Sequence, residues 1–335
     1  MESIYPWQNA KWKEISTRVE TETLPHALLI SGPKGIGKKS FSFAIVQSIL
    51  CETLTANDLA CGKCTSCLLL SAETHPDLKF VEPAGKSATI SVDQIRELTT
   101  YVALTPHIGS RKIVLIHDAE KMNTNAANSL LKSLEEPPSS SLIILVSSQH
   151  SILLPTIRSR CQLLSLPLPS QDITEKWLAA NVNTEFDAGL LLALAQGAPL
   201  SALALSQDNV FKNRLLQFSL LQQLAQQKAD PVSVVALWLK NGIDYSIFWL
   251  NTWVKDMAKL KVAATSKFIS NPDLFRELQQ LSQDIPLQKL LEFQVQVENA
   301  AKLLRGNMSR ELLLEELLIH WIGLIRKSKK QSLSS

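Results

Sequence analysis

The 335-residue sequence contains no apolar run of the roughly 18 to 20 residues that a membrane-spanning helix needs. Its first residues, Met1 to Lys13, lack the continuous apolar core of a secretory signal. A strong excess of one charge is also missing, since 34 Lys and Arg against 31 Asp and Glu give a net charge of +3. A dedicated nucleic-acid-binding protein usually concentrates more positive charge. We therefore expect a cytoplasmic protein without a membrane partner, whose charge alone does not demand a nucleic acid.

The composition excludes general disorder, because 45% of the residues are hydrophobic and only 19% are charged. Short apolar runs alternate with helical patterns in the first half of the chain. Strands are predicted at Ala27–Ile30, Leu78–Val81, Ile113–Ile116, Leu142–Val146 and Gln162–Leu164. The third and fourth runs are apolar at consecutive positions, as expected of strands covered on both faces. This alternation predicts an α/β domain with a parallel, doubly wound sheet.

Two prolines, Pro167 and Pro169, end the strand pattern, because proline disfavours both a helix and a central strand. The rest of the chain has a helical pattern and should be all-α. At this length we expect two or three domains. We place their bounds at 1–166, 167–207 and 208–335.

The last predicted helix, from Arg310 to Ile325, is apolar around most of its circumference. It should therefore be buried between other helices. The polar tail from Arg326 to Ser335 should fray. Trp249 and Trp253 are four residues apart in a helical run, which favours core packing or a helical interface over chemistry.

A phosphate-binding loop is predicted between the first strand and the next helix. The segment from Gly32 to Lys38 fits G-x-x-x-x-G-K, with further glycines at Gly35 and Gly37. Glycines let backbone N–H groups turn onto a phosphate, and the helix N-terminus adds positive potential. Lys38 would reach the β- and γ-phosphates of a nucleotide.

Two groups that organise magnesium are missing from this loop and its surroundings. Lys39 stands where a Ser or Thr hydroxyl should hold the ion, and Ser40 is displaced by about 100° around the helix. After the third strand, His117 and Asp118 replace the Asp–Glu pair that organises the ion and activates water. We therefore predict a degenerate site without ATP hydrolysis, although passive binding of nucleotide or phosphate stays open.

Four of the five cysteines lie close together, at Cys51, Cys61, Cys64 and Cys67. In a cytosolic chain this clustering favours a metal over disulfides, and four thiolates suffice for a closed structural zinc site. An iron–sulfur cluster and free buried thiols are the alternatives. His75 could replace Cys51 as the fourth ligand, although it reads better as part of a turn.

Two further motifs carry a resemblance to a known family. The run from Asn128 to Pro138, NSLLKSLEEPP, and the run from Ile157 to Cys161, IRSRC, resemble signatures of the AAA+ clamp-loader subunits of bacterial DNA polymerase III. The order of phosphate loop, cysteine cluster, degenerate acidic site and these motifs is most similar to the delta-prime type. Tyr5-Pro6-Trp7 agrees with it. The match covers about residues 5–205 and continues more weakly beyond.

The resemblance implies an architecture for the three regions. Residues 1–166 would be a RecA-like phosphate-loop domain with a zinc-binding insertion at 51–67, residues 167–207 a helical lid, and 208–335 a helical collar. The collar would join gamma/tau-type and delta-type subunits in a hetero-pentameric ring. That ring would load the sliding clamp onto primer–template DNA. Where the family has a lid arginine after Gly-x-x, this chain has Leu200.

The resemblance also implies that Arg160 is an arginine finger supplied to a neighbouring subunit. Such a guanidinium is worth about 10³ to 10⁵ in rate in well-studied cases. An ordinary surface ion pair and the nearby Arg158 are the competing interpretations. Our first hypothesis is a non-hydrolysing stator. The alternatives are an ATP-hydrolysing motor of the same architecture and a stand-alone zinc protein that binds nucleic acid. We identify no polymerase site, so nucleotidyltransferase activity would belong to the holoenzyme.

Overall fold

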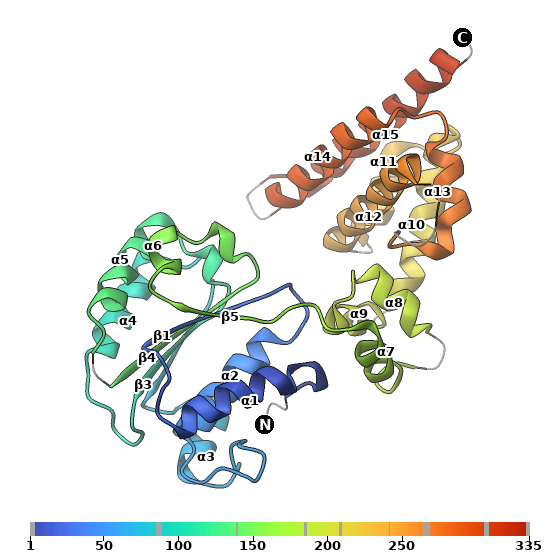
Figure 1. The fold of residues 1–335 in the computed structure, drawn as a ribbon. Coiled ribbons are helices and arrows are strands. Elements are labelled where there is room, and N and C mark those ends of the chain that lie inside the picture. The colour runs from blue at the N-terminus through green and yellow to red at the C-terminus, as the bar shows by residue number, and fades with distance from the viewer. Residues whose placement is uncertain are drawn as a thin grey trace. The chain divides into compact units, whose positions relative to one another are not determined.

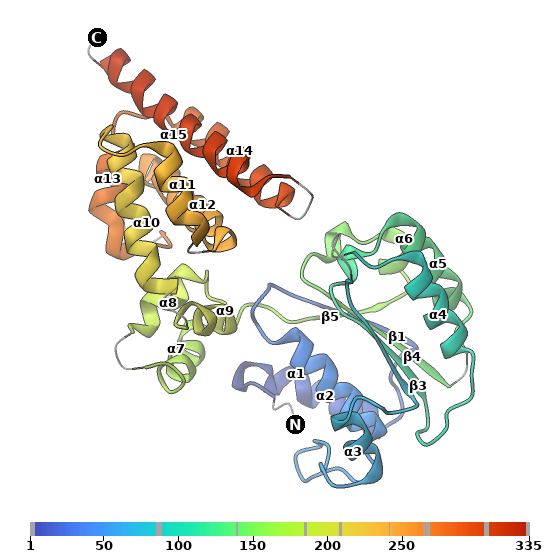
Figure 2. The ribbon, with the colours of Figure 1, turned by 180° about the vertical axis from the view of Figure 1, so that it is seen from behind.

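The computed structural model describes residues 4–84, 89–138, 140–183, 186–207, 210–240, 242–263, 265, 269–304 and 308–332. The chain forms two compact units, Met1–Thr174 and Glu175–Ser335. The first is α/β and the second is all-α (Figures 1 and 2), so the predicted fold class is confirmed. The predicted division into three domains stays a prediction, and Asp208, the first residue of the predicted third domain, lies outside the described residues.

The first unit is built on a parallel sheet with strand order β2-β3-β4-β1-β5. Its strands are β1 (Ala27–Ser31), β2 (Leu78–Val81), β3 (Lys112–Ile116), β4 (Ser141–Ser147) and β5 (Gln162–Ser165), which confirms all five predicted strands. Leu29 of β1 lies beside Leu145 of β4 and Leu163 of β5. Because parallel strands share a carboxyl edge, the loop after β1 lies at the switch in strand order where such folds bind ligands.

Helices cover both faces of this sheet (Figure 1). One face carries α1 (Asn9–Glu20), α2 (Lys38–Leu50) and α3 (Thr65–Ser71), and the other carries α4 (Val92–Val102), α5 (Thr124–Glu135) and α6 (Pro155–Arg158). Strand side chains alternate between the two layers, so Leu28 and Ile30 enter one core while Ala27 and Leu29 enter the other. Both faces of the sheet are therefore buried, as the consecutive apolar runs predicted.

The second unit is a bundle of helices. Helix α7 (Gln171–Ala179) leads into it, and its further helices are α8 (Ala188–Leu194), α9 (Pro199–Leu205), α10 (Val210–Ala225), α11 (Pro231–Lys240), α12 (Ile243–Val262), α13 (Phe275–Ser282), α14 (Leu287–Leu303) and α15 (Arg310–Ser332). In the part of the chain that the structure describes, no single helix is long and apolar enough to cross a membrane. The bent pair α8 and α9 passes that test only when taken together, by length and composition.

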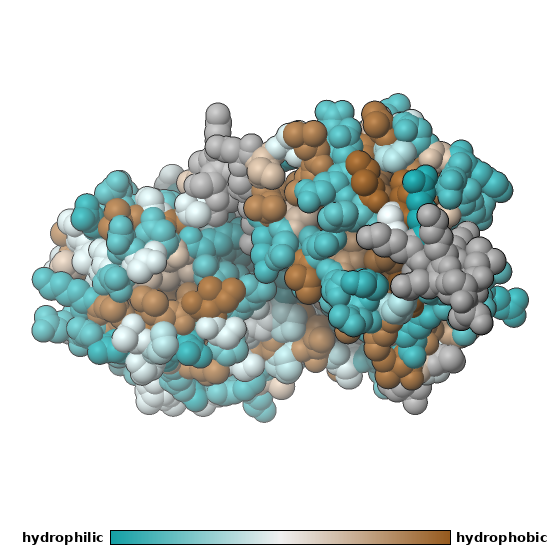
Figure 3. Space-filling view, turned by 90° about the horizontal axis from the view of Figure 1, so that it is seen from above, coloured by the Kyte–Doolittle hydropathy of each residue, from teal (hydrophilic) through white to brown (hydrophobic). Residues whose placement is uncertain are grey.

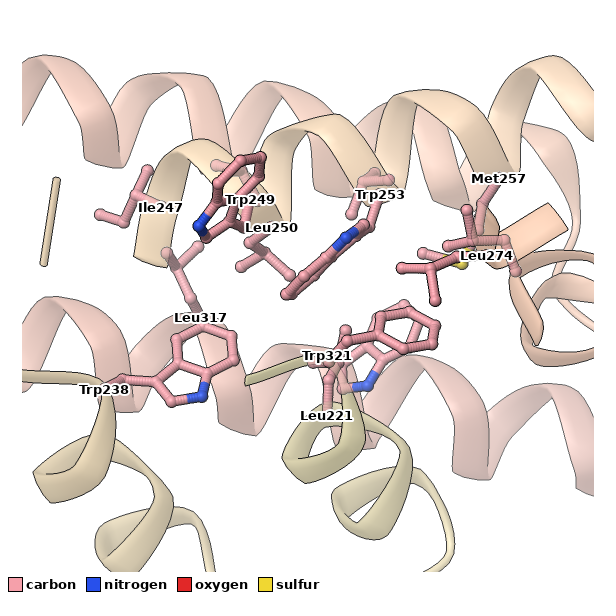
Figure 4. Packing of buried hydrophobic residues seen from close by; sticks show 14 of the residues in the cluster. Leu221, Trp238, Ile247, Trp249, Leu250, Trp253, Met257, Leu274, Leu317 and Trp321 are labelled. Atoms are coloured by element: carbon pink, nitrogen blue, oxygen red, sulfur yellow. The ribbon is translucent and has the colours of Figure 1, made fainter. Parts of the chain in front are cut away.

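Four tryptophans lie in the core of this bundle (Figure 4). They are Trp238, Trp249, Trp253 and Trp321, each at most 1% exposed. The ring centroids of Trp238 and Trp253 are 6.4 Å apart in an edge arrangement. Aromatic pairs of this kind add packing energy beyond the area they bury. The interpretation of Trp249 and Trp253 as packing residues is confirmed.

Helix α15 departs from its prediction in two ways. Leu317 and Trp321 are buried as expected, but Leu312 and Ile319 are 64% and 57% exposed. The expectation that the helix is covered all round is therefore wrong, because α15 lies at the outside of the bundle. The fraying expected from Arg326 is also wrong as far as Ser332, where the helix ends. Residues 333–335 of the predicted tail lie outside the described residues.

Candidate nucleotide site, candidate metal centre and Arg160

The phosphate loop has the shape that its glycines permit. Gly35 and Gly37 adopt φ angles of 79° and 84°, in the left-handed region that favours glycine, and Gly37 directly precedes α2. A Cβ on Gly32 would lie 2.1 Å from the carbonyl oxygen of Leu166. The backbone just after β5 therefore passes too close for a larger residue. The predicted loop context, after a buried strand and before a helix, is present.

Lys38 is folded back onto its own loop. Its Nζ donates a hydrogen bond to the Pro33 carbonyl at 2.6 Å, and the residue is 6% exposed. Burial lowers the pKa of Lys38 to about 8, although the carboxylates of Glu120 and Asp118 act in the opposite direction. This lysine lies at the loop as predicted.

Lys39 lies between two carboxylates at the carboxyl edge of the sheet. Its Nζ is 3.5 Å from Oε2 of Glu82 and 3.7 Å from Oδ2 of Asp118. Glu82 follows β2 and Asp118 follows β3, and these two strands are neighbours. Carboxylate oxygens are the ligands that Mg²⁺ prefers. Here they contact the ammonium group of the chain itself.

Sequence reasoning did not find Glu82. The signal was available, since Glu82 directly follows a predicted strand. Its relevance depended on β2 and β3 being adjacent in the sheet, which the order of strands along the chain does not give. Glu82 and Lys39 are also far apart in the sequence, so no local pattern predicts their contact.

His117 is buried beside this cluster, with 5% of its surface exposed. Its Nε2 lies 3.1 Å from Oγ of Ser42 on α2, and its ring packs edge-on against Phe80 with centroids 4.6 Å apart. Burial, aided by the charge of Lys39 and opposed by Asp118, lowers the pKa of His117 to about 4. The imidazole is therefore neutral near pH 7. A buried neutral imidazole is a poor substitute for the hard oxygen ligands of Mg²⁺.

A segment near the N-terminus, Tyr5–Gln8, covers the phosphate loop. The indole of Trp7 donates a hydrogen bond to the carbonyl of Ile36 at 3.0 Å. The Gln8 amide donates to Ile36 and Gly37 at 2.9 and 3.0 Å. Tyr5 stacks on Trp7, and its ring would lie 2.6 Å from a Cβ on Gly37. Sequence reasoning noted these residues only as part of a resemblance, because no local pattern reports a contact made across about 30 positions.

The four clustered cysteines, Cys51, Cys61, Cys64 and Cys67, converge in the insertion after α2. The Sγ atoms of Cys51 and Cys64 are 3.9 Å apart, and those of Cys61 and Cys67 are 4.0 Å apart. All four sulfur atoms lie within 4.8 Å of one another. Backbone N–H groups also point at sulfur, since Lys63 and Cys64 both donate to Cys61 at 3.4 Å.

These distances fit a tetrahedral metal site. Four thiolates at 2.3 Å from a zinc ion lie about 3.8 Å apart. The backbone hydrogen bonds from Lys63 and Cys64 lower the pKa of Cys61 to about 6, which favours the thiolate that a metal needs. A site closed by four protein ligands has no position for a substrate, so its role would be structural. The predicted ligand set is brought together in full.

The competing ligands lie elsewhere. His75 is buried in the turn before β2, where its Nδ1 accepts the N–H of Asp77 at 3.0 Å. Cys161 belongs to the core under α4 to α6, and burial raises the pKa of its thiol to about 12. Both outcomes agree with the preferred interpretations from sequence.

Arg160 lies two residues after the end of α6, on the face of the sheet opposite α2. Its Nη2 contacts Oε1 of Glu135 at 2.7 Å, and its Nη1 donates to the carbonyl of Thr156 at 3.0 Å. The side chain is 35% exposed. Arg158 is exposed and has no ion pair with any of the described residues. The structure thus brings together the two sequence motifs, since Glu135 belongs to one and Arg160 to the other.

Comparison with known proteins agrees with these features. A family model described as "DNA polymerase III, delta subunit" matches residues 7–170, and one for its C-terminal part matches residues 208–323. DNA polymerase III subunit delta' of Pseudomonas aeruginosa is 36% identical over 97% of this chain and 99% of its own length. The Escherichia coli protein of that name is 32% identical over 94% of each chain.

The chain belongs to the DNA polymerase III subunit delta' family. The resemblance to the delta-prime type that was drawn from the motifs is therefore confirmed. A solved gamma-subunit-related protein of Thermotoga maritima has 19% identity and a TM-score of 0.49, with 94% of this chain and 99% of that one covered. The assignment rests on the sequence relatives, which cover nearly the whole chain.

Proposed function

We propose that this chain is a clamp-loader subunit of DNA polymerase III that does not hydrolyse ATP and supplies Arg160 to the nucleotide site of a neighbouring subunit. Family membership supports the assignment as a clamp-loader subunit. The absence of ATP hydrolysis is inferred from one observation, the ammonium of Lys39 between Glu82 and Asp118. These carboxylates lie where a working site would organise a divalent ion, and their charge is already matched by a tethered cation.

The chemistry of phosphoryl transfer explains why this matters. The protein contributes mainly positioning and charge neutralisation, and Mg²⁺ bridges the β- and γ-phosphate oxygens. Lys39 repels a divalent ion from the same carboxylates. Neutral His117, hydrogen-bonded to Ser42, offers no charge to replace the missing aspartate. The loop keeps its glycines and Lys38, but the hydroxyl that would hold the ion is replaced by Lys39, which pairs with the nearby carboxylates.

Arg160 suits a role in trans. It lies after α6, bound to α5 and α6, and none of its contacts within the described residues is to the phosphate loop of its own chain. A guanidinium is always charged and presents a planar fork of donors that matches phosphate oxygens. Over a third of this side chain is exposed, so it is accessible to another subunit.

Other parts of the chain would serve assembly. Gamma/tau-type and delta-type subunits are the partners proposed for a pentameric ring that loads the sliding clamp onto primer–template DNA. The exposed apolar residues Leu312 and Ile319 of α15 offer a surface for such a partner. Cys51, Cys61, Cys64 and Cys67 would bind structural zinc and cross-link the insertion. A lid or collar role for the second unit follows the same family assignment.

The experiment is reconstitution of the loader with partner ATPase subunits. The isolated chain should show no magnesium-dependent ATP turnover. In the reconstituted loader, Arg160→Ala should assemble normally and lower DNA-stimulated hydrolysis by about 10³-fold or more. Arg158→Ala is the matched control, since Arg158 is two residues away, exposed and in α6. It should keep the wild-type rate.

Two results would contradict the proposal. One is turnover by the isolated chain near the 1 s⁻¹ of a working phosphoryl-transfer enzyme. The other is an Arg160→Ala loader that hydrolyses ATP as fast as the Arg158→Ala control. The first would favour the ATP-hydrolysing alternative, and the second would remove the finger role while leaving family membership intact.

A further inference from the structure

We infer that Glu135 is a positioning residue for Arg160, holding one side of the guanidinium so that its other donors stay available to a phosphate of the neighbouring subunit. The inference rests on the proposed function and adds a residue to it. Its basis is the 2.7 Å contact between Oε1 of Glu135 and Nη2 of Arg160. No sequence pattern links the two residues directly.

Some N–H groups of the Arg160 guanidinium contact neighbouring residues, and others contact none of the described residues. Nη1 donates to the carbonyl of Thr156 at 3.0 Å and lies 3.5 Å from Oγ of Ser159, while Nη2 contacts Glu135. A guanidinium carries five N–H donors in a rigid plane. Its Nε and the remaining hydrogens of the terminal nitrogens contact no partner among the described residues. Fixing two nitrogens of a rigid plane fixes the direction of the others.

The location of Glu135 makes the pair more than a chance surface contact. Glu135 is the last residue of α5, and the C-terminus of a helix disfavours a carboxylate. The next residue, Glu136, is exposed and has no ion pair with any described residue. A cation is therefore favoured at this helix end, where Lys132 lies in the last turn and Arg160 pairs with Glu135. The ion pair also joins the C-terminus of α5 to the turn after α6. Arg160 is therefore held by its backbone, whose N–H donates to Ile157, and by its guanidinium.

Fixing the orientation of the guanidinium should increase the reaction rate, because a disordered catalytic group spends less time in the productive geometry. Long side chains such as arginine lose rotamer freedom when they are fixed in one geometry. If Glu135 and Thr156 impose that geometry before the subunits meet, less is lost when the phosphate binds. A misplacement of about 1 Å can cost on the order of 10²-fold in rate. Removing Glu135 should therefore lower the rate without abolishing it.

The test uses the reconstituted loader and DNA-stimulated ATP turnover. Glu135→Ala should lower kcat by about tenfold and leave the KM for ATP unchanged, because only transition-state contacts are weakened. Glu135→Gln, which keeps the acceptor oxygen, should recover part of the rate. Glu136→Ala is the matched control and should behave as the wild type. Adding Glu135→Ala to Arg160→Ala should cause no further loss, since Glu135 acts through Arg160.

The outcomes separate this inference from the function it rests on. A slow Arg160→Ala loader with a wild-type Glu135→Ala loader would overturn the inference and keep the proposed function. A full-rate Arg160→Ala loader would overturn both. A further tenfold loss in the double variant would show that Glu135 acts independently of Arg160, as a residue needed for folding or assembly would. Melting curves of the isolated variants check folding directly.

Discussion

Lys39 supplies a positive charge where two neighbouring parallel strands end in carboxylates. Its partners Glu82 and Asp118 are 52% and 32% exposed, so the ion pairs contribute little to stability, about 0 to 1 kcal/mol each. Their importance is chemical. One substituted side chain removes the hydroxyl that a metal would use and pairs with the carboxylates that a metal would bind. A single position thereby accounts for two departures from the magnesium-binding pattern of phosphate-loop ATPases.

His117 provides a pH-dependent test of the same cluster. Its folded pKa of about 4 lies below the value of about 6.5 expected in the unfolded chain. Between these values the unfolded state binds a proton that the folded state does not. The contribution of neutral His117 to the free energy of unfolding is thus fully present above about pH 6.5. It is lost as the pH falls to about 4, by on the order of 3 kcal/mol. We expect His117→Gln to lose less stability in this range.

The measurement is urea unfolding of wild type and His117→Gln at several pH values between 7.5 and 5. His75 is also buried with a lowered pKa, but it is present in both proteins, so the difference between them reports His117. Gln can still meet the hydroxyl of Ser42. Identical loss of stability in the two proteins would mean that His117 is solvated and charged, and that the site is less closed than described.

At the scale of elements, the strands and the loop were predictable because local patterns encode them. β3 and β4 are apolar at consecutive positions and are buried on both faces. The four cysteines were also predictable, because their spacing of ten, three and three residues brings them together over a short stretch. Glu82 and the segment Tyr5–Gln8 were not, because their contacts depend on sheet order and on tertiary packing.

Helix α15 shows a different limit. The apolar side chains of Leu312 and Ile319 led to the prediction that they are buried. A sequence pattern does not distinguish an apolar helix face that is buried from one that is exposed. The prediction of burial was right for Leu317 and Trp321 and wrong for the opposite face. Exposed apolar side chains on a long helix are an observation that only the structure provides.

The cysteine insertion should behave as a metal-dependent element. We expect wild-type protein to contain about one zinc ion per chain and Cys64→Ser to contain almost none, because loss of one thiolate opens a four-ligand site. Binding free energy of the metal is folding free energy for such a segment. Proteolysis should therefore cut within residues 51–67 faster in the variant. Metal content is measured by atomic spectroscopy and cleavage by mass spectrometry.

Cys161→Ser is the matched control for this experiment, since Cys161 lies in a separate core and should leave the zinc content unchanged. The sheet should stay folded in both variants. Full zinc occupancy in Cys64→Ser, or an iron–sulfur absorption spectrum in the wild type, would contradict the assignment.

At the scale of the whole molecule, the two units divide the proposed tasks. The α/β unit contains the phosphate loop, the four clustered cysteines and Arg160, and the helical unit has its own tryptophan-rich core. Apolar and polar side chains are interspersed over the surface seen in Figure 3. Scattered apolar residues are ordinary on a protein surface. Leu312 and Ile319 lie seven residues apart, on one face of a single helix.

This face of α15 gives the last prediction. Replacing Leu312 and Ile319 together by Asp should weaken association with partner subunits by about tenfold or more, because apolar contacts in a subunit interface typically contribute over 1 kcal/mol when they are hot spots. Folding should be unaffected, since both side chains are more than half exposed. Val262→Asp is the control, at a position that is 76% exposed at the end of α12. Association is followed by analytical ultracentrifugation, with melting temperatures measured in parallel. If the α15 variant assembles as well as the Val262 variant, the subunits meet through another surface, and the exposed face of α15 has no part in assembly.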